Sequence, residues 1–147
     1  MKRKIAGTGR IWIHAVSVGE VNIAMKLIQA LRESDSSLEF VLSTTTSTGF
    51  KLAATRKTSW LEPIYNPVDF YPVARRAMRL IRPRVLILVE AEVWPNCVCE
   101  AKKINCPVVL VNAPLLALPC SMAALPMRLT LGHGNTIHSQ PHPLSTA

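Results

Sequence analysis

The first residue in this chain that could do chemistry is Glu20, which closes the segment SVGE at residues 17–20, directly after an apolar run at residues 10–16. A carboxylate placed there could act as a general base and take a proton from a substrate hydroxyl. Gly19 would let the backbone turn sharply and let a substrate approach closely. The same spacing also fits a plain helix cap, in which Ser17 or Glu20 satisfies free amide groups. Spacing alone leaves both interpretations open.

A second cluster of reactive side chains follows the uninterrupted apolar run at residues 85–89, where the chain reads EAEVWPN at residues 90–96. Glu90 and Glu92 are two residues apart, so they share a side if the segment is extended. Two such carboxylates, with Asn96 close behind, could hold sugar hydroxyls or act on the charge state of Glu20 across a cleft. In the alternative interpretation, Glu92 caps the next helix and Trp94 packs in the core.

A third loop, TTTSTG at residues 44–49, offers the hydroxyls and amides of Thr45 and Thr46 to a phosphate or a sugar. It lacks the lysine of a phosphate-binding loop, so hydrolysis of a nucleoside triphosphate is not expected. An ordinary turn with a helix cap fits equally well. His14 lies within an apolar strand pattern and is interpreted as a core histidine rather than a catalyst.

These loops alternate with strand and helix patterns, which indicates a parallel sheet with helices on both faces. The expected fold class is therefore α/β and Rossmann-like, with ligands collecting beyond the carboxyl ends of the strands. Pro63 is expected to break the third strand, and Asp69 to cap the third helix. Strands are predicted at residues 10–16, 38–44, 60–65, 85–89 and 107–111, and helices at residues 21–32, 48–55, 69–81 and 93–103.

The composition points to an anionic partner, because 17 Lys and Arg against 9 Asp and Glu give a formal net charge of +8. Aromatic residues make up only 5% and do not alternate with basic ones, which argues against a platform for single-stranded nucleic acid. Arg75, Arg79 and Arg82 share one face of a predicted helix that also carries Arg76. They form either a solvated face or a docking site for anionic lipid headgroups.

No metal or cofactor is expected, because the four cysteines show no metal-ligand spacing and three histidines (His133, His138 and His142) lie in a Gly-, Pro- and Ser-rich segment. Three regions are predicted: a basic segment at residues 1–9, a Rossmann-like domain at 10–113, and an irregular or disordered tail at 114–147. Residues 104–127 are uncharged and long enough to cross a bilayer, but four prolines favour a buried strand followed by irregular chain.

Several of these segments resemble the 3-deoxy-D-manno-octulosonic acid (Kdo) transferases: IWIHAVSVGEVN at residues 11–22, EAEVWPN at 90–96 and PVVLVNA at 107–113, with TTTSTG and Arg82-Pro83 in the expected order. The resemblance implies that residues 10–113 are the acceptor-binding, N-terminal half of a GT-B glycosyltransferase that is inverting and independent of metal. Such enzymes move Kdo from CMP-Kdo to a hydroxyl of a lipid A precursor, at the cytoplasmic face of the inner membrane. Glu20 would be the general base, and the substrate-binding residues would be Ser17, Gly19, Thr45, Thr46, Glu90, Glu92 and Asn96.

The similarity ends where the family usually reads NARLS and this chain reads NAPLL at residues 112–116. The domain that would bind CMP-Kdo has no counterpart in the sequence, so the chain is expected to be inactive alone. The low-charge tail is typical of a truncated gene or a shifted reading frame. Two other hypotheses remain open: a noncatalytic basic module for anionic lipid or nucleic acid, and a fragment of another GT-B transferase or epimerase. Nucleic acid is not expected as a partner under the Kdo transferase interpretation.

Overall fold

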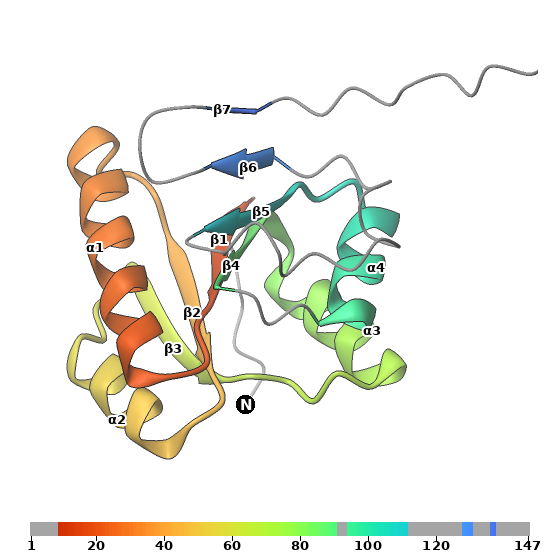
Figure 1. Cartoon of the computed structure of the whole chain (residues 1–147), viewed down its shortest axis with the longest axis horizontal. Coiled ribbons are helices and arrows are strands. Elements are labelled where there is room, and N and C mark those ends of the chain that lie inside the picture. The colour runs from red at the N-terminus through yellow and green to blue at the C-terminus, as the bar shows by residue number, and fades with distance from the viewer. Residues whose placement is uncertain (1–8, 91–93, 112–127, 131–135, 138–147) are drawn as a thin grey trace, which may run out of the picture.

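The computed structural model describes residues 9–90, 94–111, 128–130 and 136–137 (Figure 1). Within them, strands and helices alternate over most of the chain, as the periodicity predicts. The elements are β1 (Arg10–His14), α1 (Val18–Ser34), β2 (Phe40–Thr44), α2 (Ser47–Thr55), β3 (Leu61–Tyr65), α3 (Tyr71–Ile81), β4 (Pro83–Val89), α4 (Pro95–Lys103), β5 (Val108–Val111), β6 (Arg128–Thr130) and β7 (Thr136–Ile137).

The strands form one sheet in the order β3-β2-β1-β4-β5-β6-β7, parallel from β3 to β6, with only β7 antiparallel to its neighbour. The predicted Rossmann-like α/β fold is thereby confirmed. Successive strands are added outward from β1 on one side and from β4 on the other, so the winding direction reverses between β1 and β4. Ligands of such sheets bind at this reversal, outside the carboxyl ends of the strands. We call that side of the sheet the carboxyl edge.

The helices cover both faces of the sheet, with α1 and α2 on one side and α3 and α4 on the other (Figure 1). Alternate residues of the central strand divide between the two cores, because successive side chains of a strand point to opposite faces. Ile11 and Ile13 pack with the α1 and α2 side, whereas Trp12 packs with the α3 and α4 side. The central strands are therefore apolar on both faces and hold the loops that follow them firmly in place.

Pro63 does not break the third strand, contrary to expectation. It lies within β3, where its Cα pairs with that of Leu42, and its side chain is buried. Because β3 is the last strand on that side of the sheet, a residue without an amide donor can be accommodated there.

Asp69 does not cap the third helix either. The residue at the cap of α3 is Phe70, which makes no side-chain cap hydrogen bond, and Pro72 lies in the first turn. Asp69 instead accepts hydrogen bonds from the backbone amides of Asn96 and Cys97, at 3.3 and 3.1 Å. These are the first-turn amides of α4, so Asp69 caps a helix 27 residues further along the chain.

In the region predicted to be an irregular tail, five residues belong to regular structure, since Arg128–Thr130 and Thr136–Ile137 extend the sheet. At those residues the expectation of irregular chain is wrong, because β6 pairs with β5 and β7 pairs with β6, which satisfies their backbone groups. The remaining residues of the tail, its three histidines included, lie outside the described part. Across the described residues, no helix is long and apolar enough to span a membrane.

Candidate active site

Glu20 lies at the carboxyl edge, in the first turn of α1, and the residue is 6% exposed. Its carboxylate accepts hydrogen bonds from two backbone amides, that of Val16 at 2.8 Å and that of Ser17 at 3.2 Å. In return, the Glu20 amide donates to Ser17 Oγ at 3.3 Å, which completes a capping box. The helix cap that spacing left open is therefore present. Each carboxylate oxygen retains one unused lone-pair direction, so capping and accepting a proton are compatible.

The Val16 carbonyl ties the first loop to the second. It accepts hydrogen bonds from Thr44 Oγ1 at 3.1 Å, from Thr46 Oγ1 at 3.2 Å and from the Thr46 amide at 3.3 Å. The Thr46 hydroxyl also accepts from the Gly49 amide at 3.1 Å and so caps α2. Residues 16–20 and 44–49 are thereby fixed as one unit at the ends of β1 and β2.

Within that unit, three of the predicted substrate-binding residues have different exposures. Thr45 and Gly19 are exposed, whereas Thr46 is half-buried and already engaged. A ligand at this edge would therefore meet the Thr45 hydroxyl and the backbone at Gly19 before it met Thr46. Ser17 is half-buried, and its hydroxyl accepts the bond from the Glu20 amide.

The residues predicted on the second acidic loop, Glu90, Glu92 and Asn96, have different surroundings. Glu90 follows β4 with φ at 64°, a left-handed conformation that is uncommon for a residue with a side chain and recurs at functional loops. Its amide donates to the Val111 carbonyl at 2.8 Å, which links the loop to β5. Asn96 Nδ2 donates to the Asp69 carbonyl oxygen at 2.9 Å, so this amide group has a structural partner. Glu92 lies outside the described residues.

His14, the last residue of β1, is buried as expected of a core histidine. Its Nδ1 lies 3.0 Å from Ser43 Oγ, which also accepts a hydrogen bond from Trp12 Nε1 at 2.8 Å. Burial lowers the pKa of His14 from 6.5 to about 4, against the opposing effects of the Glu20 charge and of Ser43. The imidazole is therefore neutral at pH 7 and would not by itself supply a cation at this edge.

On its other side, His14 makes an edge-to-face contact with Trp94, with the ring centroids 5.5 Å apart. Among the described residues, His14 Nε2 and Trp94 Nε1 are buried without a hydrogen-bond partner. The interpretation of Trp94 as a packing residue is consistent with this contact.

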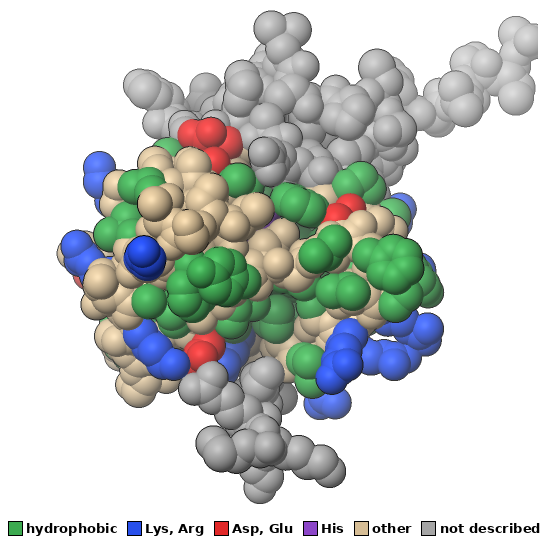
Figure 2. All heavy atoms as spheres, turned by 90° about the horizontal axis from the view of Figure 1, so that it is seen from below, with side chains coloured by type: hydrophobic (Ala, Val, Ile, Leu, Met, Phe, Trp, Pro, Cys, Tyr) green, Lys and Arg blue, Asp and Glu red, His purple; other side chains and the backbone are tan. Residues whose placement is uncertain are grey.

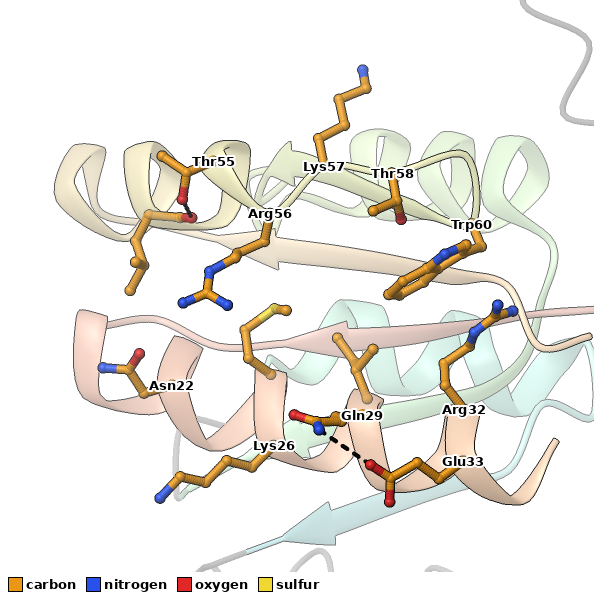
Figure 3. Close-up of a pocket in the computed structure, with 13 residues that line it drawn as sticks. Asn22, Lys26, Gln29, Arg32, Glu33, Thr55, Arg56, Lys57, Thr58 and Trp60 are labelled. Carbon is orange, nitrogen blue, oxygen red and sulfur yellow. Dashed lines mark hydrogen bonds between the residues drawn. The ribbon is translucent and has the colours of Figure 1, made fainter. Parts of the chain in front are cut away.

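A groove of about 940 Å³ lies elsewhere, between α1 and the segment from α2 to the start of β3 (Figure 3). Lys26 and Arg56 line it, and the Arg32 guanidinium lies 4.5 Å from the centre of the Trp60 ring. None of the side chains predicted for the active site lines this groove. We place the candidate site at the carboxyl edge nonetheless, because the predicted base and the winding reversal both lie there.

Sequence reasoning missed two residues that organise the site. Asp69 fixes the first turn of α4, and thereby Asn96, while Ser43 joins His14 to Trp12. The signal for Asp69 was present as a capping residue ahead of a helix, but it was assigned to the nearer helix. Ser43 gave no signal, because a serine inside an apolar strand identifies no partner.

Comparison with known proteins identifies the family of this chain. The family model described as 3-deoxy-D-manno-octulosonic-acid transferase (kdotransferase) matches residues 1–121. The 3-deoxy-D-manno-octulosonic acid transferase of Bordetella pertussis is 38% identical over 110 residues, which cover 70% of this chain and 25% of that protein. The bifunctional glycosyltransferase/methyltransferase of Fusobacterium nucleatum is 35% identical over 104 residues, covering 69% of this chain and 16% of that protein.

A probable mitochondrial 3-deoxy-D-manno-octulosonic acid transferase of Arabidopsis thaliana is 29% identical over 121 residues, covering 82% of this chain and 27% of that protein. The chain thus spans about a quarter or less of the length of these three relatives. The chain belongs to the Kdo transferase family of glycosyltransferases, and residues 1–121 match the N-terminal domain of that family.

Proposed function

We propose that this chain is the acceptor-binding domain of a GT-B glycosyltransferase that moves Kdo from CMP-Kdo to a hydroxyl of a lipid A precursor in lipopolysaccharide biosynthesis. The observation that carries the proposal is the placement of Glu20. It is a buried carboxylate at the carboxyl edge, held by the amides of Val16 and Ser17 beside the winding reversal of the sheet. Membership of the family supports the reaction class.

In the proposed reaction, the acceptor hydroxyl attacks the anomeric carbon of Kdo while Glu20 takes the hydroxyl proton. A carbon–oxygen bond forms to the acceptor, and the bond from the anomeric carbon to the CMP phosphate breaks, releasing CMP. The two amides at 2.8 and 3.2 Å hold the carboxylate in one orientation, so the base is positioned before the acceptor arrives. The acceptor site would be lined by Thr45, Gly19 and Glu90. The surrounding loops would be held in place by Ser17, Thr46 and Asn96.

We also propose that the chain does not transfer Kdo by itself, because the residues that would bind CMP-Kdo belong to a second domain in this arrangement. Its place would be the cytoplasmic face of the inner membrane, as a peripheral protein. Incubation of the purified chain with CMP-Kdo and a lipid A precursor should yield no Kdo-modified lipid by mass spectrometry. Transfer by the chain alone would contradict this part of the proposal.

Acceptor binding is tested by titrating a ¹⁵N-labelled chain with a detergent-solubilised lipid A precursor and following the amide resonances. Shifts should centre on Gly19 and Thr45, with little change at Lys26 in the groove between α1 and α2. A response confined to that groove, or no response, would contradict the acceptor site. Glu20→Gln should weaken the response, whereas Glu33→Gln, which changes an exposed carboxylate at the far end of α1, should not.

A further inference from the structure

The groove between α1 and residues 52–60, which we call the flank groove, takes no part in the proposed function. Its volume of about 940 Å³ lies within the range of small-molecule sites, roughly 300–1,000 Å³. On α1, its lining residues recur from Asn22 to Glu33 at intervals of three or four residues, so they share one face of the helix. That stretch corresponds to about 16 Å of helix. The flank groove therefore has the size and the length to hold a small elongated molecule.

The apolar part of the flank groove is mainly aliphatic. Met25 and Leu52 line it and are partly buried against the core. Trp60 also lines it, but its ring is already in contact with the Arg32 guanidinium, 4.5 Å from the ring centre, and with Phe40, at 6.4 Å between centroids. A planar ligand would have to displace one of these contacts in order to stack on Trp60, whereas an aliphatic chain can lie on Met25 and Leu52 as they stand.

Among the described residues, two basic side chains of the flank groove have no acidic partner. Of the four basic residues that line it, Arg32 donates to a backbone carbonyl at 3.0 Å, and Lys57 pairs with Glu62 at 3.3 Å. Lys26 and Arg56 are exposed, and neither forms a salt bridge within the part of the chain that the structure describes. Figure 3 shows the Arg56 side chain extending from the end of α2 toward α1, whereas Lys57 points away. Lys26 and Arg56 are therefore available to an anion in the groove.

The acidic residue in the lining, Glu33, does not neutralise these two cations. It accepts a hydrogen bond from Gln29 Nε2 at 3.1 Å and lies seven residues along α1 from Lys26, which is about 10 Å of helix. Figure 2 shows Lys and Arg side chains on both flanks of the molecule, so positive charge alone does not single out this site. What distinguishes the flank groove is that unpaired cations border an aliphatic surface within one hollow.

We propose that the flank groove binds a single-chain organic anion, a small molecule with an aliphatic body and an acidic head. The body covers Met25 and Leu52, and the head lies between Lys26 and Arg56. An inorganic anion would leave the aliphatic surface in water, and an uncharged chain would gain nothing from the two cations. The ligand is a free molecule, because the groove has the volume of one small-molecule site. This site is separate from the carboxyl edge and goes beyond the proposed function.

The test is a titration of the ¹⁵N-labelled full chain with decanoate, below the concentration at which it forms micelles and without acceptor or detergent. Amide shifts should saturate and should centre on Gln29 and Thr58, with little change at Gly19 and Thr45. Acetate, which has the head without the chain, and decyltrimethylammonium, which has the chain with the opposite charge, should each bind at least tenfold more weakly. Equal binding of either control, shifts centred on the carboxyl edge, or no binding of decanoate would overturn the proposal.

Two pairs of substitutions locate the acidic head. The double variant Lys26→Gln with Arg56→Gln should bind decanoate about tenfold more weakly, because hydrogen bonds to charged groups are the stronger ones. The matched control is Arg75→Gln with Arg76→Gln, which removes the same charge from exposed positions of α3, on the other face of the sheet. At 0.1 M salt the control should change binding less than twofold, since charges beyond about 10 Å are screened. Equal losses from both pairs would mean that net charge alone attracts the ligand, and the proposed site would be wrong.

The aliphatic surface is tested by Met25→Gln, which keeps a straight side chain of similar helix propensity and should weaken decanoate binding about fivefold. Leu80→Gln, at an exposed position of α3, is the control and should leave binding unchanged. Circular dichroism checks that each variant is folded. Equal affinities of the two folded variants would contradict the aliphatic contact. Because decanoate and the lipid acceptor are titrated separately, failure of decanoate to bind refutes only the flank site, and missing acceptor shifts at the carboxyl edge refute only the proposed function.

Discussion

Replacing His14 by phenylalanine should remove most of one pH-dependent contribution to stability. Burial lowers the pKa of His14 from 6.5 to about 4, so the folded chain holds the neutral imidazole where the unfolded chain would bind a proton. The pKa is lower in the folded state, and the contribution is therefore fully present above about pH 6.5. It is lost as the pH falls from 6.5 toward 4.

The lowering of this pKa corresponds to about 3 kcal/mol of stability at neutral pH, most of which is lost between pH 7.5 and pH 4.5. Phenylalanine keeps an aromatic ring against Trp94 but does not titrate. Ser43 Oγ retains its hydrogen bond from Trp12 Nε1 at 2.8 Å, so the substitution leaves this buried hydroxyl with a partner.

The assay is urea unfolding of both proteins at pH 7.5 and at pH 4.5, followed by tryptophan fluorescence. The free energy of unfolding of the unmodified chain should fall by about 2–3 kcal/mol more than that of His14→Phe. Titrating groups that do not interact with His14 are common to the two proteins and cancel in the difference, which leaves His14 and its coupling to Glu20. Losses that agree within about 0.5 kcal/mol would refute the reasoning, and so would an imidazole that titrates near pH 6.5 by NMR in the folded chain.

Three further predictions follow from the local geometry. Gly49→Ala should lower the free energy of unfolding by about 1–3 kcal/mol, because the added Cβ would lie 2.6 and 2.8 Å from two threonine hydroxyls. Gly19→Ala should leave the free energy of unfolding unchanged or raise it by up to about 1 kcal/mol, because its Cβ would meet nothing nearer than 3.8 Å. Thermal denaturation measures both. Asp69→Ala should lower the free energy of unfolding by about 1–2 kcal/mol through loss of the α4 cap, and Asp69→Asn should lower it by less. Equal stability of all three proteins in urea would disprove the capping role. Alkylation at pH 8 should modify the exposed Cys99 well before the buried Cys97, whose pKa burial and Asp69 raise to about 12, and peptide mass spectrometry showing equal rates would contradict this.

The Gly19→Ala variant also bears on the proposed function. If the backbone at Gly19 allows a substrate to approach, the added methyl group should weaken the acceptor-dependent shifts while the chain stays folded. Unchanged acceptor binding would assign Gly19 to the helix start alone.

Much of the fold was predictable from the sequence, because the alternating or helical spacing of apolar residues is a local property of the chain. The strand through Ile13 and the helix that begins after Ser17 were both expected, although α1 extends further at each end than predicted. The spacing of Ser17 and Glu20 offered a helix cap as one of two interpretations, and the structure shows that the cap is reciprocal. The role of Glu20 as a general base follows from the family resemblance and stays a prediction. The structure adds the position of its carboxylate at the carboxyl edge of the sheet.

The tertiary structure decided what depends on partners distant in sequence. Pro63 is accommodated because β3 has a neighbour on only one side, and strand order is not written in the strand itself. Asp69 reaches α4 because packing brings that helix start close, and burial between two helical layers makes His14 neutral. The sequence alone therefore determined the local elements and their reactive residues. Only the packed chain decided which helix Asp69 caps and which side chains remain exposed together, because both depend on distances between segments that local patterns do not specify.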